Sequence, residues 1–132
     1  MSLAEATVTL RFFGDDIQPD YITRLLGVAP KSARVKETEP RKPGWKIRTG
    51  NWIYGVEGAD VDLLIHELFA RLPDDAAIWH ELARYEPDLF VGMFMGTTND
   101  MPYISAAAIG LLAKRCVALQ FDIYTPLESD DD

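Results

Sequence analysis

Cysteine and histidine are scarce in this chain of 132 residues, which contains one cysteine and two histidines. A single cysteine cannot form an intramolecular disulfide, which fits a protein of the reducing cytoplasm. Cys116 stands at the start of an apolar segment, so we expect it to pack as a small buried hydrophobic side chain.

Metal-binding and catalytic motifs are also absent. His66 and His80 are each followed by glutamate, but the helical zinc motif needs a second histidine four residues later, where this chain has Ala70 and Arg84. No motif links a serine or the cysteine to a histidine, and there is no glycine-rich phosphate loop. We therefore expect no catalytic residue, no metal site and no cofactor.

The sequence has no long apolar run. None approaches the roughly 18–20 residues that span a bilayer, and the N-terminus lacks the basic and apolar regions of a secretory signal. We therefore expect a cytoplasmic protein that does not associate with membranes. The length and the ordinary composition suit a single domain over residues 1–132, with disordered tails at 1–5 and 126–132.

Charge is unevenly distributed along the chain. The net charge of −8 disfavours nucleic acid as a partner, because phosphates repel a negative body. Residues 31–48 hold seven lysines or arginines and two glutamates, a local charge of +5, so the rest of the chain carries −13. An acidic surface of this kind favours docking of a basic protein partner.

Residues 7–30 predict a strand, a tight turn and a helix. Polar and apolar residues alternate from Thr7 to Phe13, as in a half-buried strand. An apolar stripe then predicts a helix that begins near Pro19 and ends at Gly27. We interpret three acidic residues at its start as helix-capping groups and not as cation ligands: Asp15, Asp16 and Asp20.

The middle of the chain contains a long charged loop at residues 31–44, rich in proline and charge. Loops of this length in a compact domain are usually functional or mobile. The next segment, 45–56, is rich in strand-forming residues but is interrupted at residues 49–51. It could be a hairpin or one long strand with a bulge, and the sequence leaves both open.

The second half predicts three more helices and two strands. The helices begin at the capping residues Asp60, Asp74 or Asp75, and Ser105. The strand at residues 89–96 is apolar on both faces, which predicts a strand that is covered on both sides or lies centrally in the sheet. Residues 117–124 predict the last strand.

The fold class that follows is an α+β two-layer sandwich, in which a mixed sheet of four to six strands carries helices on one face. Residues 13–23 and 95–105 share a short pattern of glycine, proline and a polar helix start. Whether the fold consists of two related β-α-β halves stays open.

The turn, cap and core residues of the chain resemble a small bacterial family, the domain of unknown function 4279. The resemblance covers about residues 8–124, and it departs from the family pattern at Glu37-Thr38, where a glycine commonly follows the lysine at position 36. It implies a bacterial, cytosolic α+β domain and supplies no catalytic residues. The resemblance rests on Gly14-Asp15, Pro19, Ile22-Thr23, Leu26-Gly27, Pro30, Lys36, Trp45, Arg71-Leu72 and Asp122-Ile123-Tyr124.

The best candidate for a binding site is a segment in which cations alternate with aromatic residues. Such a segment can stack a planar ligand and pair with a phosphate. The opposing interpretation is a solvated loop that leads into a strand whose tryptophans belong to the core. The candidate ligand-binding residues are Lys42, Trp45, Lys46, Arg48, Trp52 and Tyr54.

Two functions remain in contention. The first is a non-enzymatic protein-interaction domain, similar to an immunity or adaptor protein, whose acidic surface docks a basic partner. The alternative is a module that binds a small ligand or nucleotide through residues 42–54. The sequence leaves the oligomeric state open, a homodimer included.

Overall fold

The strand β1 lies at the centre of a five-stranded sheet with the order β2-β3-β1-β4-β5. The computed structural model describes residues 5–96 and 101–125. The strands are β1 (Glu5–Gly14), β2 (Ser32–Arg34), β3 (Gly50–Gly58), β4 (Asp88–Phe94) and β5 (Ala118–Tyr124). The helices are α1 (Pro19–Leu26), α2 (Val61–Ala70), α3 (Ala76–Leu82), the 3-10 turn η1 (Ala83–Tyr85) and α4 (Ala106–Lys114).

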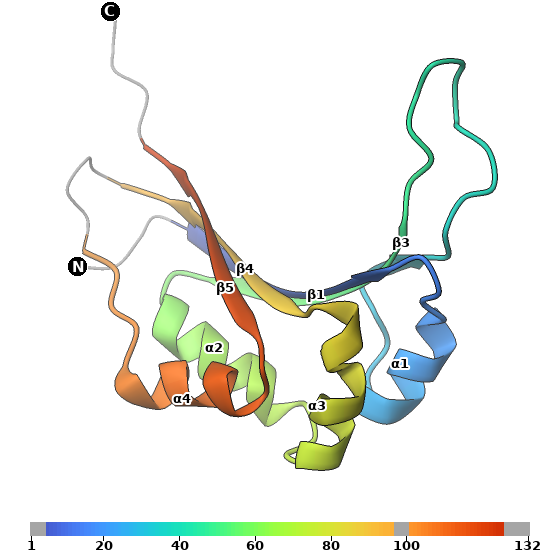
Figure 1. The fold of residues 1–132 in the computed structure, drawn as a ribbon. Helices are drawn as coiled ribbons and strands as arrows, with labels where there is room; N and C mark the ends of the chain where they lie inside the picture. The colour runs from blue at the N-terminus through green and yellow to red at the C-terminus, as the bar shows by residue number, and fades with distance from the viewer. Residues whose placement is uncertain (1–4, 97–100, 126–132) are drawn as a thin grey trace, which may run out of the picture.

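The sheet is mixed. β1 pairs antiparallel with β3 and β4, β2 pairs antiparallel with β3, and β4 pairs parallel with β5. The helices all lie against one face of the sheet (Figure 1). The predicted α+β sandwich with a mixed sheet and helices on one face is thus confirmed.

Each half of the chain contains a helix that joins two strands of the same direction. In the second half, α4 joins the neighbouring strands β4 and β5. In the first half, α1 joins β1 to β2, but β3 lies between these two strands. The two halves therefore share an element order and differ in their strand pairing.

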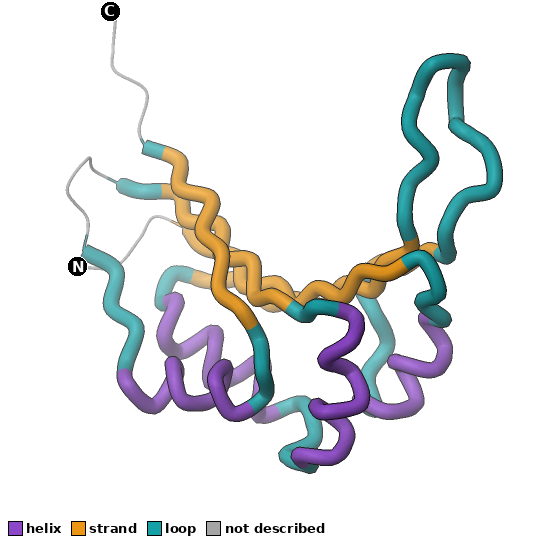
Figure 2. The backbone as a smooth tube through the Cα atoms, viewed as in Figure 1, coloured by secondary structure: helices purple, strands orange, loops and turns teal. Residues whose placement is uncertain are grey.

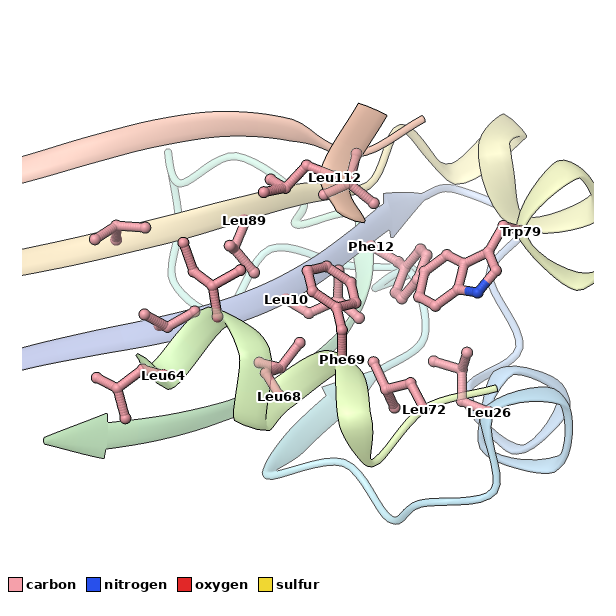
Figure 3. Packing of buried hydrophobic residues seen from close by; sticks show 14 of the residues in the cluster. Leu10, Phe12, Leu26, Leu64, Leu68, Phe69, Leu72, Trp79, Leu89 and Leu112 are labelled. Carbon is pink, nitrogen blue, oxygen red and sulfur yellow. The ribbon is translucent and has the colours of Figure 1, made fainter. Parts of the chain in front are cut away.

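The core lies between the sheet and the helices. The alternation predicted for β1 puts Val8, Leu10 and Phe12 on the helix side, where they have no exposed surface. From the helix layer, Leu68 and Phe69 of α2 pack against them (Figure 3). Full burial of one such side chain is worth about 1.5–3 kcal/mol.

The predicted helix ends are confirmed at several positions. Asp60, Asp75 and Ser105 each accept a hydrogen bond from a backbone N–H in the first turn of their helices, at 2.9 to 3.2 Å. Gly27 ends α1 with a φ of 76°, the left-handed conformation that glycine adopts without strain. Pro19 occupies the first turn of α1.

The capping role predicted at the start of α1 is wrong for Asp15 and Asp16, whereas Asp20 does lie in the first turn of the helix. The residue that precedes the helix is Gln18, and its side chain makes no capping hydrogen bond. Asp15 instead accepts hydrogen bonds from Thr49 and Lys36, and Asp16 lies 3.7 Å from Arg84. Contacts with residues distant in the sequence therefore determine where these carboxylates point.

The expectation for Cys116 is also wrong, because this residue is exposed. It ends α4 in the left-handed conformation, with a φ of 59°, and the backbone then turns into β5. This turn directs the thiol towards solvent and leaves Val117 to be buried instead.

For the strand at 89–96, the predicted position inside the sheet is confirmed and the predicted burial of both faces is wrong. β4 does lie inside the sheet, and Leu89, Val91 and Met93 are buried against the helices. Phe90 is only half-buried and Phe94 is 41% exposed, because none of the described helices lies on their face of the sheet. At the predicted N-terminal tail, Glu5 already belongs to β1, while residues 1–4 and 126–132 lie outside the described residues.

Candidate functional site

The most prominent feature outside the two layers is the segment of residues 35–49 between β2 and β3, which we call the arm. It rises from one end of the sheet, on the side opposite the helices (Figure 2). β3 begins only at Gly50, so residues 45–49 belong to the arm. The segment 45–56 is therefore neither a hairpin nor one long bulged strand.

Glu37 and Arg48 hold the two sides of the arm together. The backbone N–H of Glu37 donates to the carbonyl of Arg48 at 3.0 Å, and the N–H of Arg48 donates to the Glu37 carboxylate at 2.9 Å. The guanidinium also reaches this carboxylate, with 2.8 Å between Nη2 and Oε2. These hydrogen bonds, that from the guanidinium above all, lower the pKa of Glu37 to about 2. Arg48 therefore has a bracing role here.

Asp15 holds the base of the arm. Its carboxylate accepts hydrogen bonds from the Thr49 hydroxyl at 2.7 Å and from the Lys36 ammonium at 3.1 Å. The hydrogen bond from Thr49, followed by that from Lys36, lowers the pKa of Asp15. Arg34 adds a bond to the carbonyl of Thr49 at 3.0 Å. The turn after β1 is thereby joined to both sides of the arm.

The tip of the arm exposes one aromatic ring beside two cations. The N–H of Trp45 donates to the carbonyl of Lys42 at 3.0 Å, and Gly44 between them has a φ of 84°. Proline followed by a glycine of positive φ suits a type II turn. The ammonium of Lys42 lies 4.9 Å from the centre of the Trp45 ring, which is 53% exposed. In the described part of the chain, no carboxylate pairs with Lys42 or Lys46.

Two of the predicted site residues lie away from this tip, on the helix side of β3. Trp52 is fully buried, and its ring nitrogen donates to the Thr23 hydroxyl at 3.0 Å. Tyr54 stacks on Trp52 with 6.2 Å between ring centres, and Arg71 donates to its hydroxyl at 3.4 Å. The core interpretation thus holds for Trp52, and of the predicted site residues the structure brings Lys42 and Trp45 into contact, with Lys46 next to Trp45 in the chain.

The face of the sheet away from the helices, which we call the open face, carries a cluster that the sequence did not single out. Arg11 binds Asp88 through two parallel hydrogen bonds of 2.8 and 2.7 Å. Its guanidinium lies 4.2 Å from the centre of the Phe90 ring and 5.1 Å from that of Phe13. The alternation in β1 already placed Arg11 on the outward face, but its partners come from a strand about 77 residues away, which no local pattern reveals.

Small residues lie beside this cluster on the open face. Gly55 and Gly92 flank Thr9 and Thr7 in the neighbouring strand β1. A Cβ atom at Gly55 would come within 2.9 Å of the Thr9 hydroxyl, and one at Gly92 within 2.7 Å of the Thr7 hydroxyl. The threonine hydroxyls therefore occupy the space beside these glycines, and a larger residue at either position would force them to shift.

The charge of the described residues is less negative than that of the whole chain. All thirteen lysines and arginines are described, whereas five of the twenty-one acidic residues are not. Several of the described carboxylates are bound to cations of the chain itself, Asp15, Asp74 and Asp88 among them. The described residues therefore carry a net charge of −3, and those outside residues 31–48 carry −8.

Each of the two histidines lies on a helix, away from the arm and the open face. His66 lies 3.7 Å from Asp62, one helical turn away, and His80 is exposed on α3. Within residues 5–96 and 101–125, no three histidine, cysteine or acidic side chains come together as metal ligands would. None of the helices in these ranges is long and apolar enough to cross a membrane.

The fold defines a class of protein: a two-layer α+β domain with one open sheet face and a braced basic arm. The sequence model of one family, described as "Domain of unknown function (DUF4279)", matches residues 4–126, and the chain belongs to this family. Neither the curated proteins nor the solved structures contain a match to the chain.

Proposed function

We propose that this protein is a non-enzymatic protein-interaction domain that binds an acidic segment of a partner through the arm and the adjoining open face. The observation that carries the proposal is the tip of the arm, where Trp45 is exposed beside Lys42 and where no carboxylate of the described residues pairs with Lys42 or Lys46. Tryptophan is among the residues that dominate binding energy in interfaces. The two lysines add positive charge that can orient an acidic segment.

The bracing of the arm supports this function. Ordering a loop on binding costs free energy, and a loop that is already held in place avoids much of that cost. Glu37, Arg48 and Asp15 hold the arm by hydrogen bonds that leave the tip itself free. An element that served only to connect β2 and β3 would not need this bracing.

The charge of the arm favours an acidic partner. Residues 31–48 carry +5, and complementary charge speeds and orients docking. The whole-chain charge had suggested a basic partner on an acidic surface. The described residues outside 31–48 carry −8, so the arm and not the rest of the domain is the part whose charge attracts an acidic segment.

Binding of a nucleotide or another planar anion at the same tip is the second candidate, since Trp45 could stack on a base while Lys42 and Lys46 contact a phosphate. The separation of the aromatic residues weakens it. Trp52 and Tyr54 lie on the helix side of the sheet, so a planar ligand would find one ring and not a sandwich of two. A partner protein that also contacts the open face makes fuller use of the surface.

The proposal is tested with a panel of synthetic peptides, acidic and basic but matched in their apolar residues, together with nucleotides. Binding is followed by the emission of Trp45, the exposed one of the three tryptophans. We expect acidic peptides to bind, and their affinity to fall as salt is raised. The double variant Lys42→Glu, Lys46→Glu should lose this binding, whereas Arg24→Glu, an exposed cation on α1, should retain it.

Two results would overturn the proposal. One is the absence of any change in emission with acidic peptides at low salt. The other is binding that survives reversal of charge at Lys42 and Lys46. Quenching by nucleotides alone, lost in the same double variant, would favour the second candidate instead.

A further inference from the structure

The two edges of the sheet differ in how well they are protected. Natural sheets blunt their edge strands with shortness, charge or proline, because an unpaired edge recruits other strands. β2 follows this rule, since it has three residues, ends at Arg34 and leads into the charged arm. β5 has seven residues, pairs only with β4 among the described strands, and contains no lysine, arginine or proline.

The side chains of β5 add to this exposure. Leu119, Phe121 and Ile123 alternate with the polar residues of the strand and are 36%, 44% and 53% exposed. The end of β5 rises away from the helix layer, which does not cover it there (Figure 1). β5 thus has the alternating apolar residues of a half-buried strand, although its outer edge is unpaired.

The backbone pairing of β5 identifies the free hydrogen-bonding groups. The N–H of Ala118 donates to Pro87, and the carbonyl of Tyr124 accepts from Met95, both from the β4 side. Because the direction of backbone groups alternates along a strand, residues 118, 120, 122 and 124 face β4. Residues 119, 121 and 123 direct their N–H and C=O groups to the free edge.

We propose that a second copy of this chain occupies this edge, with the two β5 strands antiparallel about a twofold axis at Phe121. A symmetric dimer requires a patch that is complementary to itself. In this register, Phe121 faces Phe121, and Leu119 faces Ile123 of the other copy. On the open face, Gln120 faces Asp122, so no two like charges meet.

The neighbouring registers are less favourable. An axis at Asp122 would put two carboxylates directly opposite each other, and like charges opposite each other destabilise a sheet. An axis at Gln120 would pair Ile123 with Val117, which precedes the strand and is buried within its own subunit. If the axis lay between two adjacent residues, each residue with free N–H and C=O groups would face a residue of the other copy whose groups already bind β4. An axis at Phe121 pairs all seven residues of β5 with their counterparts in the other copy.

The dimer and the function proposed for the arm respond differently to salt, which keeps their tests separate. Two copies of a chain with a charge of −8 repel each other, and added salt screens this repulsion. The dimer should therefore strengthen as salt rises, while binding of an acidic peptide to the arm should weaken.

The test uses charge reversal at the symmetry axis, followed by sedimentation. Phe121→Asp and Phe121→Lys each place two like charges in contact, so each variant should be monomeric at concentrations where the unmodified chain is a dimer. An equimolar mixture of the two variants should restore a dimer, because Asp then faces Lys. Leu63→Asp, which changes a leucine on α2 that is 54% exposed, should leave the dimer intact.

Hydrogen exchange of the unmodified chain provides a readout that does not depend on a variant. The amides of residues 119, 121 and 123 should become protected as concentration rises, while those of Ser32 and Arg34 on the other edge should not change. A chain that remains monomeric, a dimer that both charge variants leave intact, or a mixture that stays monomeric although both variants are folded by circular dichroism would each overturn the proposal.

Discussion

At the scale of single residues, two helices of this protein end in the same left-handed conformation with different side chains. Gly27 ends α1 at a φ of 76°, whereas Cys116 follows α4 at a φ of 59°. Glycine adopts this region freely, while other residues pay a backbone strain of roughly 1–2 kcal/mol. Glycine and cysteine substitutions at these two ends therefore have opposite expected effects.

Gly27→Ala should lower the free energy of unfolding by about 1 kcal/mol. A Cβ atom at this position meets nothing within 4 Å, so the loss comes from the backbone alone. Cys116→Gly should raise the stability by up to about 1 kcal/mol, because its exposed thiol contributes little packing. Urea denaturation of both variants and of the unmodified chain tests these two predictions. Equal midpoints for all three proteins would contradict them.

The hydrogen bonds between Glu37 and Arg48 predict that the pKa of the Glu37 carboxylate lies well below its ordinary value. The pKa of Glu37 is about 2 when folded and 4.5 ordinarily, so its contribution to stability is complete above pH 4.5. That contribution is lost as the pH falls from about 4.5 through about 2, because protonation breaks the contact with Arg48. A carboxyl NMR titration should find the low midpoint, and Arg48→Gln should move it upwards. A Glu37 midpoint near 4.5 in the unmodified chain would show that the contact between Glu37 and Arg48 does not form.

At the scale of elements, β4 illustrates what a strand reveals about its surroundings. Its residues are apolar on both faces, a pattern typical of a strand covered on both sides. Here one apolar face is buried by helices, and the other forms part of the open face, where Phe94 stacks on Tyr124 at 4.8 Å. The strand itself is predictable from the sequence, while the layer above it is not.

Met93 and Phe94 allow the two faces of β4 to be compared directly. Met93 is 3% exposed, so Met93→Ala should cost roughly 2–5 kcal/mol through lost burial and the cavity left behind. Phe94→Ala removes an exposed ring and one aromatic contact, so its cost should be about 1 kcal/mol. Chemical denaturation of each variant measures the two values, and equal costs above 2 kcal/mol would mean that the open face is covered.

At the scale of the whole molecule, the sequence predicts those features that depend on neighbouring residues, such as helix starts and the buried face of a strand. Asp60 and Ser105 sit beside the helices that they cap, and the alternation in β1 identifies its buried face. The arm was harder to predict, because residues 45–49 have the composition of a strand. They lie beyond Gly14 and Arg34, the last residues of β1 and β2, and so have no strand of the sheet to pair with.

The candidate site was only partly predictable for the same reason. The sequence grouped Trp45, Trp52 and Tyr54 by proximity along the chain, but the start of β3 at Gly50 separates the first from the other two. Arg11 and Asp88 meet only because β1 and β4 are neighbours in the sheet. Strand order depends on contacts between distant segments, and one sequence does not reveal it.

The central claim is that the arm and the open face together bind an acidic partner segment, and backbone NMR on the intact chain tests it most directly. A titration with an acidic, aromatic-containing peptide should shift the resonances of residues 41–47 and of Arg11, Thr9 and Phe90. The helix layer, represented by residues 61–70, should stay unchanged. Shifts confined to the helix layer, or none at peptide concentrations in the millimolar range, would contradict the account.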